Sequence, residues 1–296
     1  MTNRPDILCI GSVLWDIIGR TDLSMAPGND KPGQITRLAG GVALNIAVTL
    51  RAQGLRPVLL SVVGEDAAGA ALLAECGRMG LDVAHVLVDR ALSTDQYVAI
   101  EAQGHLLAAL ADARSLEAAG ARILAPLEDG RLASPGAPWQ GPMAIDGNLT
   151  PDVLAEIAQS PLFSLADLRV APASPGKAER LRVFLTHPGA TIYVNAEEAG
   201  LIAGRAVSCA ESGAEALLAA GARRVLVTDG GRLAVDARAD GSVSFAPPPV
   251  APRRVTGAGD TFMAAHIAAE TRGAARAAAL THALATAAAY VAGDSR

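Results

Sequence analysis

The stretch that decides the class of fold is GVALNIAVTLRAQGLRPVLLSVVG, residues 41–64. Its first part spaces apolar residues at helical intervals and ends at Gly54, which is typical of a helix that stops at a glycine. Its second part, residues 57–64, is an apolar run rich in valine and leucine, which is typical of a buried strand. The stretch therefore predicts a helix followed directly by a strand of an internal sheet.

The same alternation continues along most of the chain. Strands separated by helices of about ten residues are typical of a parallel sheet covered on both faces. The sequence predicts an α/β fold of this kind. We expect further strands at 6–14, 141–148, 167–172, 191–195 and 222–231, and further helices at 66–80, 150–159, 175–185, 196–204 and 210–221.

Two stretches break this rhythm, at about 15–38 and about 92–110. Both read as short extended segments, and the second predicts a β-hairpin that turns at Gln103 and Gly104. A few strands inserted into an α/β sheet usually form a flap. We therefore expect a small β-strand lid. The proline-rich run at 246–254 predicts an extended connector.

Composition limits the classes of partner. The 296 residues are 51% hydrophobic and 19% charged, enough for one large core or two modest ones. A net charge of −5, without basic clusters, argues against a nucleic-acid partner. No run of 18 apolar residues predicts a membrane span, so we expect no membrane partner. The three cysteines form no C-x-x-C pair, which favours a reducing cytoplasm.

Candidate site residues follow several of the expected strands, at the edge of an open α/β sheet where ligands bind. Each also has a structural interpretation, as a turn former, a helix cap or a first-turn charge. The set is Asp16, Gly40, Gly41, Asn45, Asn195, Glu198, Thr228, Gly230, Gly257, Ala258, Gly259 and Asp260. Lys177 lies alone on an expected helix; it could approach a phosphate or a base, but a lone lysine on a helix is more often solvated, so we expect it to face solvent.

The stretch VTGAGDTFMAAH, residues 255–266, predicts an anion site. Two glycines let backbone N–H groups turn toward one point, and the helix that follows adds the positive end of its dipole. The stretch is not a P-loop, because no G-x-x-x-x-G-K-[ST] pattern is present. Nor does it match a dinucleotide fingerprint, because Phe262 occupies the last glycine position. Asp260 beside an anion site either caps the helix or has a chemical task.

Four motifs together resemble the ribokinase-like carbohydrate kinases, also called the phosphofructokinase B family. They are VTGAGDTF, the GG and following Asn in AGGVALNIAVTLRAQG, NAEE and VTDGG, and the resemblance runs from about residue 6 to 290. It implies a three-layer α/β sandwich with a mostly parallel central sheet and a small β-strand lid. It also implies one kinase domain over 1–296, with lid segments inserted at about 15–38 and 92–110.

The resemblance implies an ATP-dependent kinase that uses Mg²⁺. Asp260 would accept the proton of the attacking hydroxyl, and the N–H groups of Gly257, Ala258, Gly259 and Asp260 would stabilise the transferring phosphoryl group. Three further groups of residues take roles by the same resemblance. Asn195 and Glu198 would hold Mg²⁺ through water, Thr228 and Gly230 would line the nucleotide, and Asp16, Gly40, Gly41 and Asn45 would bind the acceptor.

Less specific segments such as DGNLTPDVL and APASPGKAERL are similar to pseudouridine kinases. They imply transfer to the 5′-hydroxyl of a nucleoside, with pseudouridine as the expected acceptor. A kinase for a free sugar such as ribose or fructose, and a non-catalytic sensor of nucleotides or sugars, remain alternatives. Because lid edges can pair between subunits, a homodimer through the lid is expected.

Overall fold

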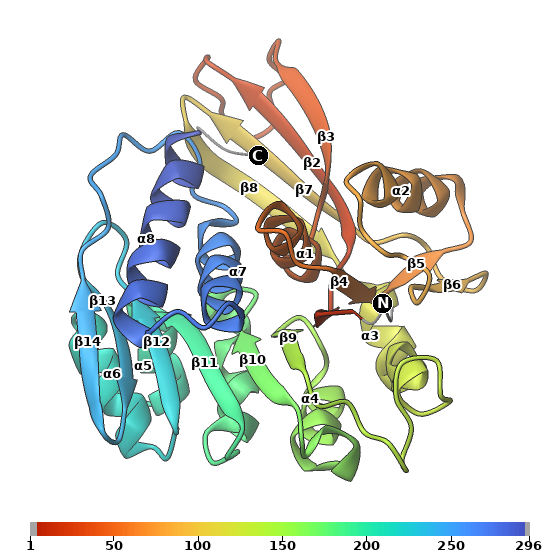
Figure 1. Ribbon diagram of the computed structural model, residues 1–296. Coiled ribbons are helices and arrows are strands. Elements are labelled where there is room, and N and C mark those ends of the chain that lie inside the picture. Colours follow the sequence, from red (N-terminus) through yellow and green to blue (C-terminus); the bar gives the residue numbers. More distant parts are fainter. Residues whose placement is uncertain (1–4, 294–296) are drawn as a thin grey trace.

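The computed structural model describes residues 5–293, so both ends of the domain expected over 1–296 lie outside the described residues. Its main sheet has eight strands (Figure 1). The first six along the chain pair in parallel, and the last two are added to the sheet by antiparallel pairing. In spatial order they are β14 (Gly241–Phe245), β13 (Ala234–Arg238), β12 (Arg224–Thr228), β11 (Ala190–Asn195), β10 (Asp167–Ala171), β9 (Pro142–Asp146), β1 (Ile7–Ile10) and β4 (Pro57–Leu60).

Helices cover both faces of this sheet because its strands are apolar on both faces. In β1, Ile7 and Cys9 join one core cluster while Leu8 and Ile10 join the other. The cluster with Ile7 lies under α1 (Val42–Ala52), α2 (Ala67–Arg78), α7 (Ala258–Thr271) and α8 (Arg276–Ala292). The other lies under α3 (Arg114–Ala119), α4 (Pro151–Gln159), α5 (Ala196–Ala203), α6 (Ala210–Ala219), η1 (Gly120–Leu127), η2 (Pro161–Phe163) and η3 (Pro175–Phe184).

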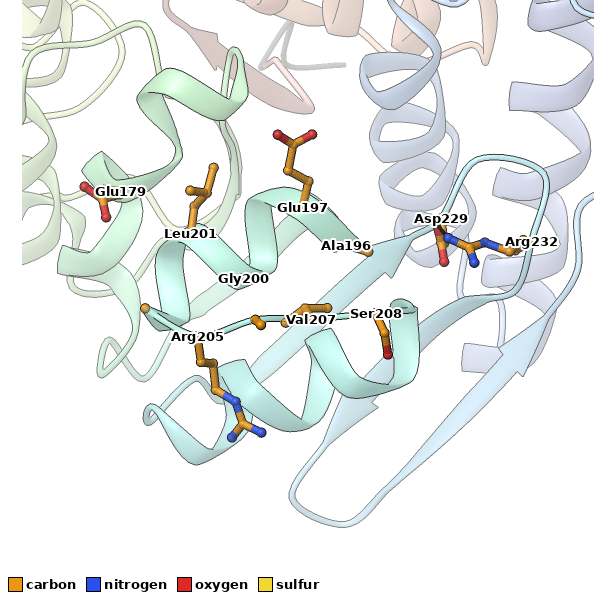
Figure 2. A pocket seen from close by; sticks show the side chains of 12 residues that line it. Glu179, Ala196, Glu197, Gly200, Leu201, Arg205, Val207, Ser208, Asp229 and Arg232 are labelled. Carbon is orange, nitrogen blue, oxygen red and sulfur yellow. Dashed lines mark hydrogen bonds and ion pairs between the residues drawn. The ribbon is translucent and has the colours of Figure 1, made fainter.

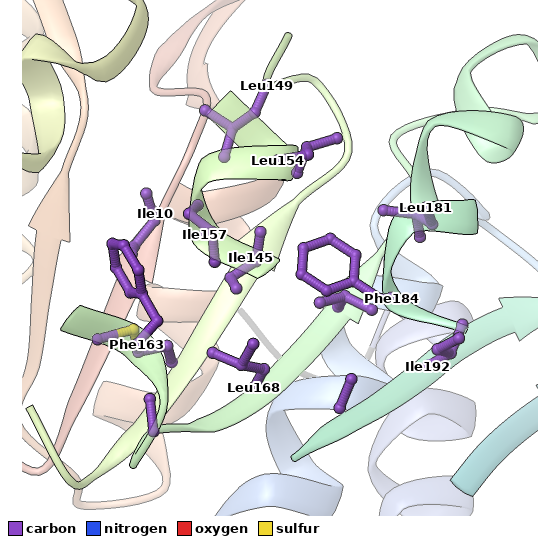
Figure 3. Packing of buried hydrophobic residues seen from close by; sticks show 14 of the residues in the cluster. Ile10, Ile145, Leu149, Leu154, Ile157, Phe163, Leu168, Leu181, Phe184 and Ile192 are labelled. Carbon is purple, nitrogen blue, oxygen red and sulfur yellow. The ribbon is translucent and has the colours of Figure 1, made fainter. Parts of the chain in front are cut away.

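Figure 3 shows how the second cluster is filled, with Phe163 and Phe184 packed among aliphatic side chains from β9, β10 and α4. Two apolar cores on opposite faces of one sheet define a three-layer sandwich. The predicted fold class is confirmed. Among residues 5–293, none of the helices has the length and apolar character needed to span a bilayer.

A second sheet of four strands forms the lid, in the order β3-β2-β7-β8 (Figure 1). Its hairpin turns at Gln103 and Gly104, as the sequence predicts, and both residues have positive φ (52° and 79°). The strands are β2 (Leu14–Thr21), β3 (Gln34–Gly40), β7 (Gln96–Ala102) and β8 (His105–Asp112).

Three expected elements differ from the structure. The strand expected at 6–14 ends at Ile10, because the chain leaves the main sheet there and enters the lid as β2. The strand expected at 57–64 breaks at Ser61, because β5 (Val62–Gly64) turns to pair with β6 (Leu87–Asp89). The helix expected at 175–185 is a 3₁₀ helix, η3; it follows Ser174, whose side chain gives no cap hydrogen bond.

Candidate active site

The start of α7 has unpaired backbone donors. Gly257 is its N-cap, with φ 85°, and no side chain caps the helix. The N–H of Ala258 donates to Val255 O at 3.0 Å and is therefore already used, although the sequence suggested it for the anion site. Among the described residues, the N–H groups of Gly257, Gly259 and Asp260 have no such acceptor. Residues 255–260, the glycine turn, thus present free donors at the positive end of a helix.

Asp260 lies directly beside these donors. Its Oδ2 accepts a hydrogen bond from Asn45 Nδ2 at 2.9 Å, across 215 positions of sequence. Desolvation raises the pKa of Asp260 to about 7, and the nearby carboxylates of Asp146, Glu198 and Asp16 add to this, while the hydrogen bond from Asn45 opposes it. A carboxylate with a pKa near neutrality can accept a proton from a hydroxyl.

Asp16 extends from lid strand β2 toward the same place. Burial raises its pKa to about 6. Gly40 lies against it so closely that a Cβ at this position would come within 2.0 Å of Asp16 Oδ2, so a larger residue would displace the Asp16 carboxylate. Gly41, the next residue, is the N-cap of α1, the helix that carries Asn45. The structure therefore brings the four predicted acceptor residues together on the Asp260 side of the lid.

Asn195 and Glu198 form a capping box at the start of α5. Asn195 Oδ1 accepts from the Glu198 N–H and Glu198 Oε2 accepts from the Asn195 N–H, both at 2.9 Å. The structural interpretation of this pair is therefore correct, and it leaves Glu198 Oε1 available. Glu198 is only 8% exposed and burial raises its pKa. It has no cationic partner among the described ion pairs.

Thr228 ends β12 opposite Asn195, and Gly230 follows with φ 57°. Beside them is a groove of about 670 Å³. Figure 2 shows its walls, formed by α5 and residues 204–208 on one side and by Asp229 and Arg232 on the other. The groove begins at the residues that directly follow Asn195 and Thr228, and it does not reach Asp260.

Sequence reasoning missed a polar network at the start of α1. Asp146 ends β9, is 0% exposed, and accepts from the backbone N–H and the hydroxyl of Ser12. The Ser12 hydroxyl also accepts from the Val42 N–H at 2.9 Å, so this pair fixes the start of α1 to the ends of β1 and β9. The position of Asp146 at the end of a buried strand was the available signal.

Lys177 belongs to the same network. Its Nζ donates to Asn148 Oδ1 at 2.6 Å, and Asn148 Nδ2 donates to the Ser12 hydroxyl at 3.1 Å. The expectation that Lys177 faces solvent is therefore wrong. The side chain is half-buried because η3 and the end of β9 lie side by side, which no local pattern reveals.

Comparisons with known proteins agree with this geometry. Residues 4–294 match the pfkB family of carbohydrate kinases. The chain is 30% identical to the pseudouridine kinase of Escherichia coli over 275 residues, which are 89% of this chain and 83% of that protein. It is 31% identical to the uncharacterized sugar kinase YeiI of Escherichia coli over 191 residues, 63% of this chain but only half of that longer protein.

The fold has close relatives among solved structures. An Escherichia coli structure described as a putative ribokinase II in complex with ATP and Mg²⁺ superposes with a TM-score of 0.77 at 19% identity, covering 97% of this chain and 93% of that one. At this identity the similarity demonstrates the fold alone. The family match spans almost the whole chain and includes the glycine turn and its Asp260. The chain belongs to the pfkB family of carbohydrate kinases and is a phosphotransferase.

Proposed function

We propose that this kinase transfers the γ-phosphoryl group of ATP to the 5′-hydroxyl of a nucleoside, with pseudouridine as its preferred acceptor. The observation that carries phosphoryl transfer is the pairing of Asp260 with free N–H groups at the start of α7. Asp260 accepts the proton of the attacking hydroxyl, and the N–H groups of Gly257 and Gly259 take up charge on the transferring group. Thr228 and Gly230 line the nucleotide.

The residues near Asp260 fit a bound Mg²⁺. Glu198 is a buried carboxylate without a cationic partner, and its Oε1 is not used by the capping box. Residues 5–293 contain no cluster of three His, Cys, Asp or Glu side chains suited to a metal ion. Mg²⁺ bound mainly by phosphate oxygens and water needs little from the protein, and Glu198 and Asn195 would hold it through its bound water. When bound, the ion offsets phosphate charge beside these carboxylates.

A nucleoside acceptor needs a surface for its planar base beyond the ribose. Tyr97 is the register partner of Asp16 across β2 and β7, so the two side chains share one face of the lid. Ala99 lies two residues further on the same face. An aromatic ring beside the carboxylate that binds ribose hydroxyls suits stacking of a base. The similarity to pseudouridine kinase supports the same acceptor.

The opposite face of the lid supports a homodimer. The strand register places Ile35, Val98, Ile100 and Leu110 together on the face that does not carry Asp16. Ile35 is 75% exposed and Leu110 71% exposed. An apolar patch on a thin sheet is typical of a surface covered by a partner. Light scattering of the purified chain tests this, and a monomeric mass at micromolar concentration would exclude it.

We further propose that the enzyme acts in the cytoplasm on a small molecule, without nucleic-acid or membrane partners. Cys9, Cys76 and Cys209 are all free thiols, which suits a reducing compartment.

The acceptor is tested by initial rates of ADP release with pseudouridine, uridine, ribose and fructose. We expect pseudouridine to have the highest kcat/KM, because a free sugar lacks the base contacts that help to close the lid. Faster turnover of ribose or fructose would mean that the acceptor is a free sugar and not a nucleoside. If all four were inert while nucleotide still bound, the result would count against the proposed acceptor and in favour of a non-catalytic sensor.

A further inference from the structure

The end of α8 packs against the glycine turn. Because α7 and α8 are consecutive antiparallel helices (Figure 1), Tyr290 near the end of α8 comes next to the start of α7. The Tyr290 hydroxyl donates to the carbonyl oxygen of Thr256 at 2.9 Å. That carbonyl belongs to the same planar peptide group as the N–H of Gly257. Fixing the carbonyl therefore fixes the direction of an N–H that lacks a protein acceptor.

Arg254 holds the tyrosine in place. Its guanidinium lies 3.7 Å from the centroid of the Tyr290 ring, and its Nε donates to the Tyr290 carbonyl at 2.8 Å. The backbone N–H of Arg253 also donates to Val291 O at 2.9 Å. The connector before the glycine turn is thus fastened to the last turn of α8 at three points. Tyr290 has little freedom to move away from Thr256.

The contact requires glycine at position 257. A Cβ there would lie 2.6 Å from the Tyr290 hydroxyl oxygen, and the φ of 85° is already unfavourable for other residues. Glycine thus satisfies two demands at once, a left-handed turn and a close approach by the tyrosine.

We propose that Tyr290 is a positioning residue for phosphoryl transfer, which aims the Gly257 N–H at the transferring phosphoryl group through the Thr256–Gly257 peptide. This inference rests on the proposed kinase function. A hydrogen bond to the carbonyl also polarises the peptide and makes its N–H a stronger donor. Burial raises the pKa of Tyr290, and the charges of Asp260 and Asp16 raise it further while Arg254 opposes them, so the hydroxyl remains a donor at neutral pH.

Tyr290→Phe tests the role of the hydroxyl, because phenylalanine keeps the ring under Arg254. Loss of a whole donor from an oxyanion site costs roughly 100-fold or more in kcat, so a misdirected donor should cost about tenfold. We expect kcat to fall by about tenfold while the KM for ATP changes less than about twofold. An unchanged kcat would overturn the proposal.

Tyr193→Phe is the matched control. The Tyr193 hydroxyl is buried and lies toward the other end of α7, where it contacts Arg169 at 3.0 Å and His266 at 2.9 Å. The Tyr290 hydroxyl is more exposed, so a purely structural effect of losing a hydroxyl would be at least as large in Tyr193→Phe as in Tyr290→Phe. We expect Tyr193→Phe to lower the melting temperature and to leave kcat within about threefold of wild type. An equal loss of kcat in both variants would overturn the proposal.

Gly257→Ala makes the test specific for the contact. Alone, it should lower kcat strongly, because its methyl group meets the Tyr290 hydroxyl. Combined with Tyr290→Phe, the methyl group has more room, so the double variant should be at least about threefold more active than Gly257→Ala alone. Strictly multiplicative losses would mean that the two residues do not interact and would contradict the proposal.

Binding of a phosphoryl mimic separates this proposal from the kinase function itself. We expect MgADP to bind wild type and Tyr290→Phe equally, and aluminium fluoride to tighten MgADP binding about tenfold less in the variant. Equal tightening in both proteins would overturn the positioning role and leave the kinase standing. No MgADP binding by wild type would remove the proposed function, and the role of Tyr290 with it.

Discussion

The two ends of α7 place partly buried carboxylates in opposite surroundings. Asp260, at the start, has Asn45 as its hydrogen-bond donor and three carboxylates nearby, so its pKa is raised to about 7. Glu270, at the end, accepts from Arg169 at 2.6 Å and from Arg224 at 2.6 and 3.0 Å. Burial alone would raise the pKa of Glu270, but these two arginines hold it at about 2.

Burial alone does not decide the pKa of these two carboxylates. Both carboxylates lose water, and the difference lies in the charge of their neighbours. The arginine-paired glutamate, which also lies beside the neutral His266, joins α7 to β10 and β12. Asp260, which has no cationic partner, has a pKa raised to about 7, and this suits its proposed role as the acceptor of a proton from a substrate hydroxyl. A desolvated carboxylate without a counter-charge is costly to keep, which favours a chemical role for Asp260 over a structural one.

The largest expected effect is on catalysis at the first end. Asp260→Asn should lower kcat by on the order of 100-fold or more, because amide cannot accept the proton. The fold should persist, since asparagine removes a poorly compensated charge. Steady-state rates together with thermal unfolding measure both. Glu270→Gln is the same chemical change at the other end and should retain kcat within about threefold. Near-normal turnover by Asp260→Asn would exclude it as the base.

The second effect is on stability at the other end. Glu270→Gln leaves two buried arginines short of a counter-charge, and breaking a buried pair costs about 3 kcal/mol in the free energy of unfolding. Urea denaturation measures this. Asp129→Asn is the control, because its ion pair with Arg131 is exposed to solvent and should contribute much less to stability. Equal losses in the two variants would mean that the Glu270 network adds nothing beyond a surface pair.

The sequence predicted the Asp260 end of α7 better than the Glu270 end, for a physical reason. Parallel strands bring their carboxyl ends to one edge, so residues following different strands, such as Asn195 and Thr228, could be grouped without knowing the strand order. The partners of Glu270 lie inside β10 and β12 on one face of the sheet. Their meeting depends on the order of strands and the placement of α7, which local patterns do not contain.

Elsewhere in the chain, too, local sequence predicted local features but not tertiary contacts. The hairpin at Gln103 and Gly104 was predictable because a two-residue turn is specified by its own residues. The link between Lys177 and Asn148 was not, because it joins segments 29 positions apart whose contact is tertiary. The structure gives the positions and surroundings of the site residues, and their roles in binding and catalysis are the predictions tested by the proposed variants.

The smallest expected effect is on the pH dependence of stability, and it has opposite signs at the two ends. The folded pKa of Asp260 is raised from 3.8 to about 7, so its contribution favours folding at low pH and is lost as pH rises from about 4 to 7. The folded pKa of Glu270 is lowered from 4.5 to about 2, so its contribution is present above about pH 4.5 and is lost as pH falls toward 2. We therefore expect Asp260→Asn to gain stability relative to wild type as pH rises to 7. We expect the loss of stability in Glu270→Gln, relative to wild type, to become smaller below pH 4.5. Urea unfolding of all three proteins between pH 3 and 8 measures these differences, and parallel stability curves would mean that neither carboxylate titrates differently on folding.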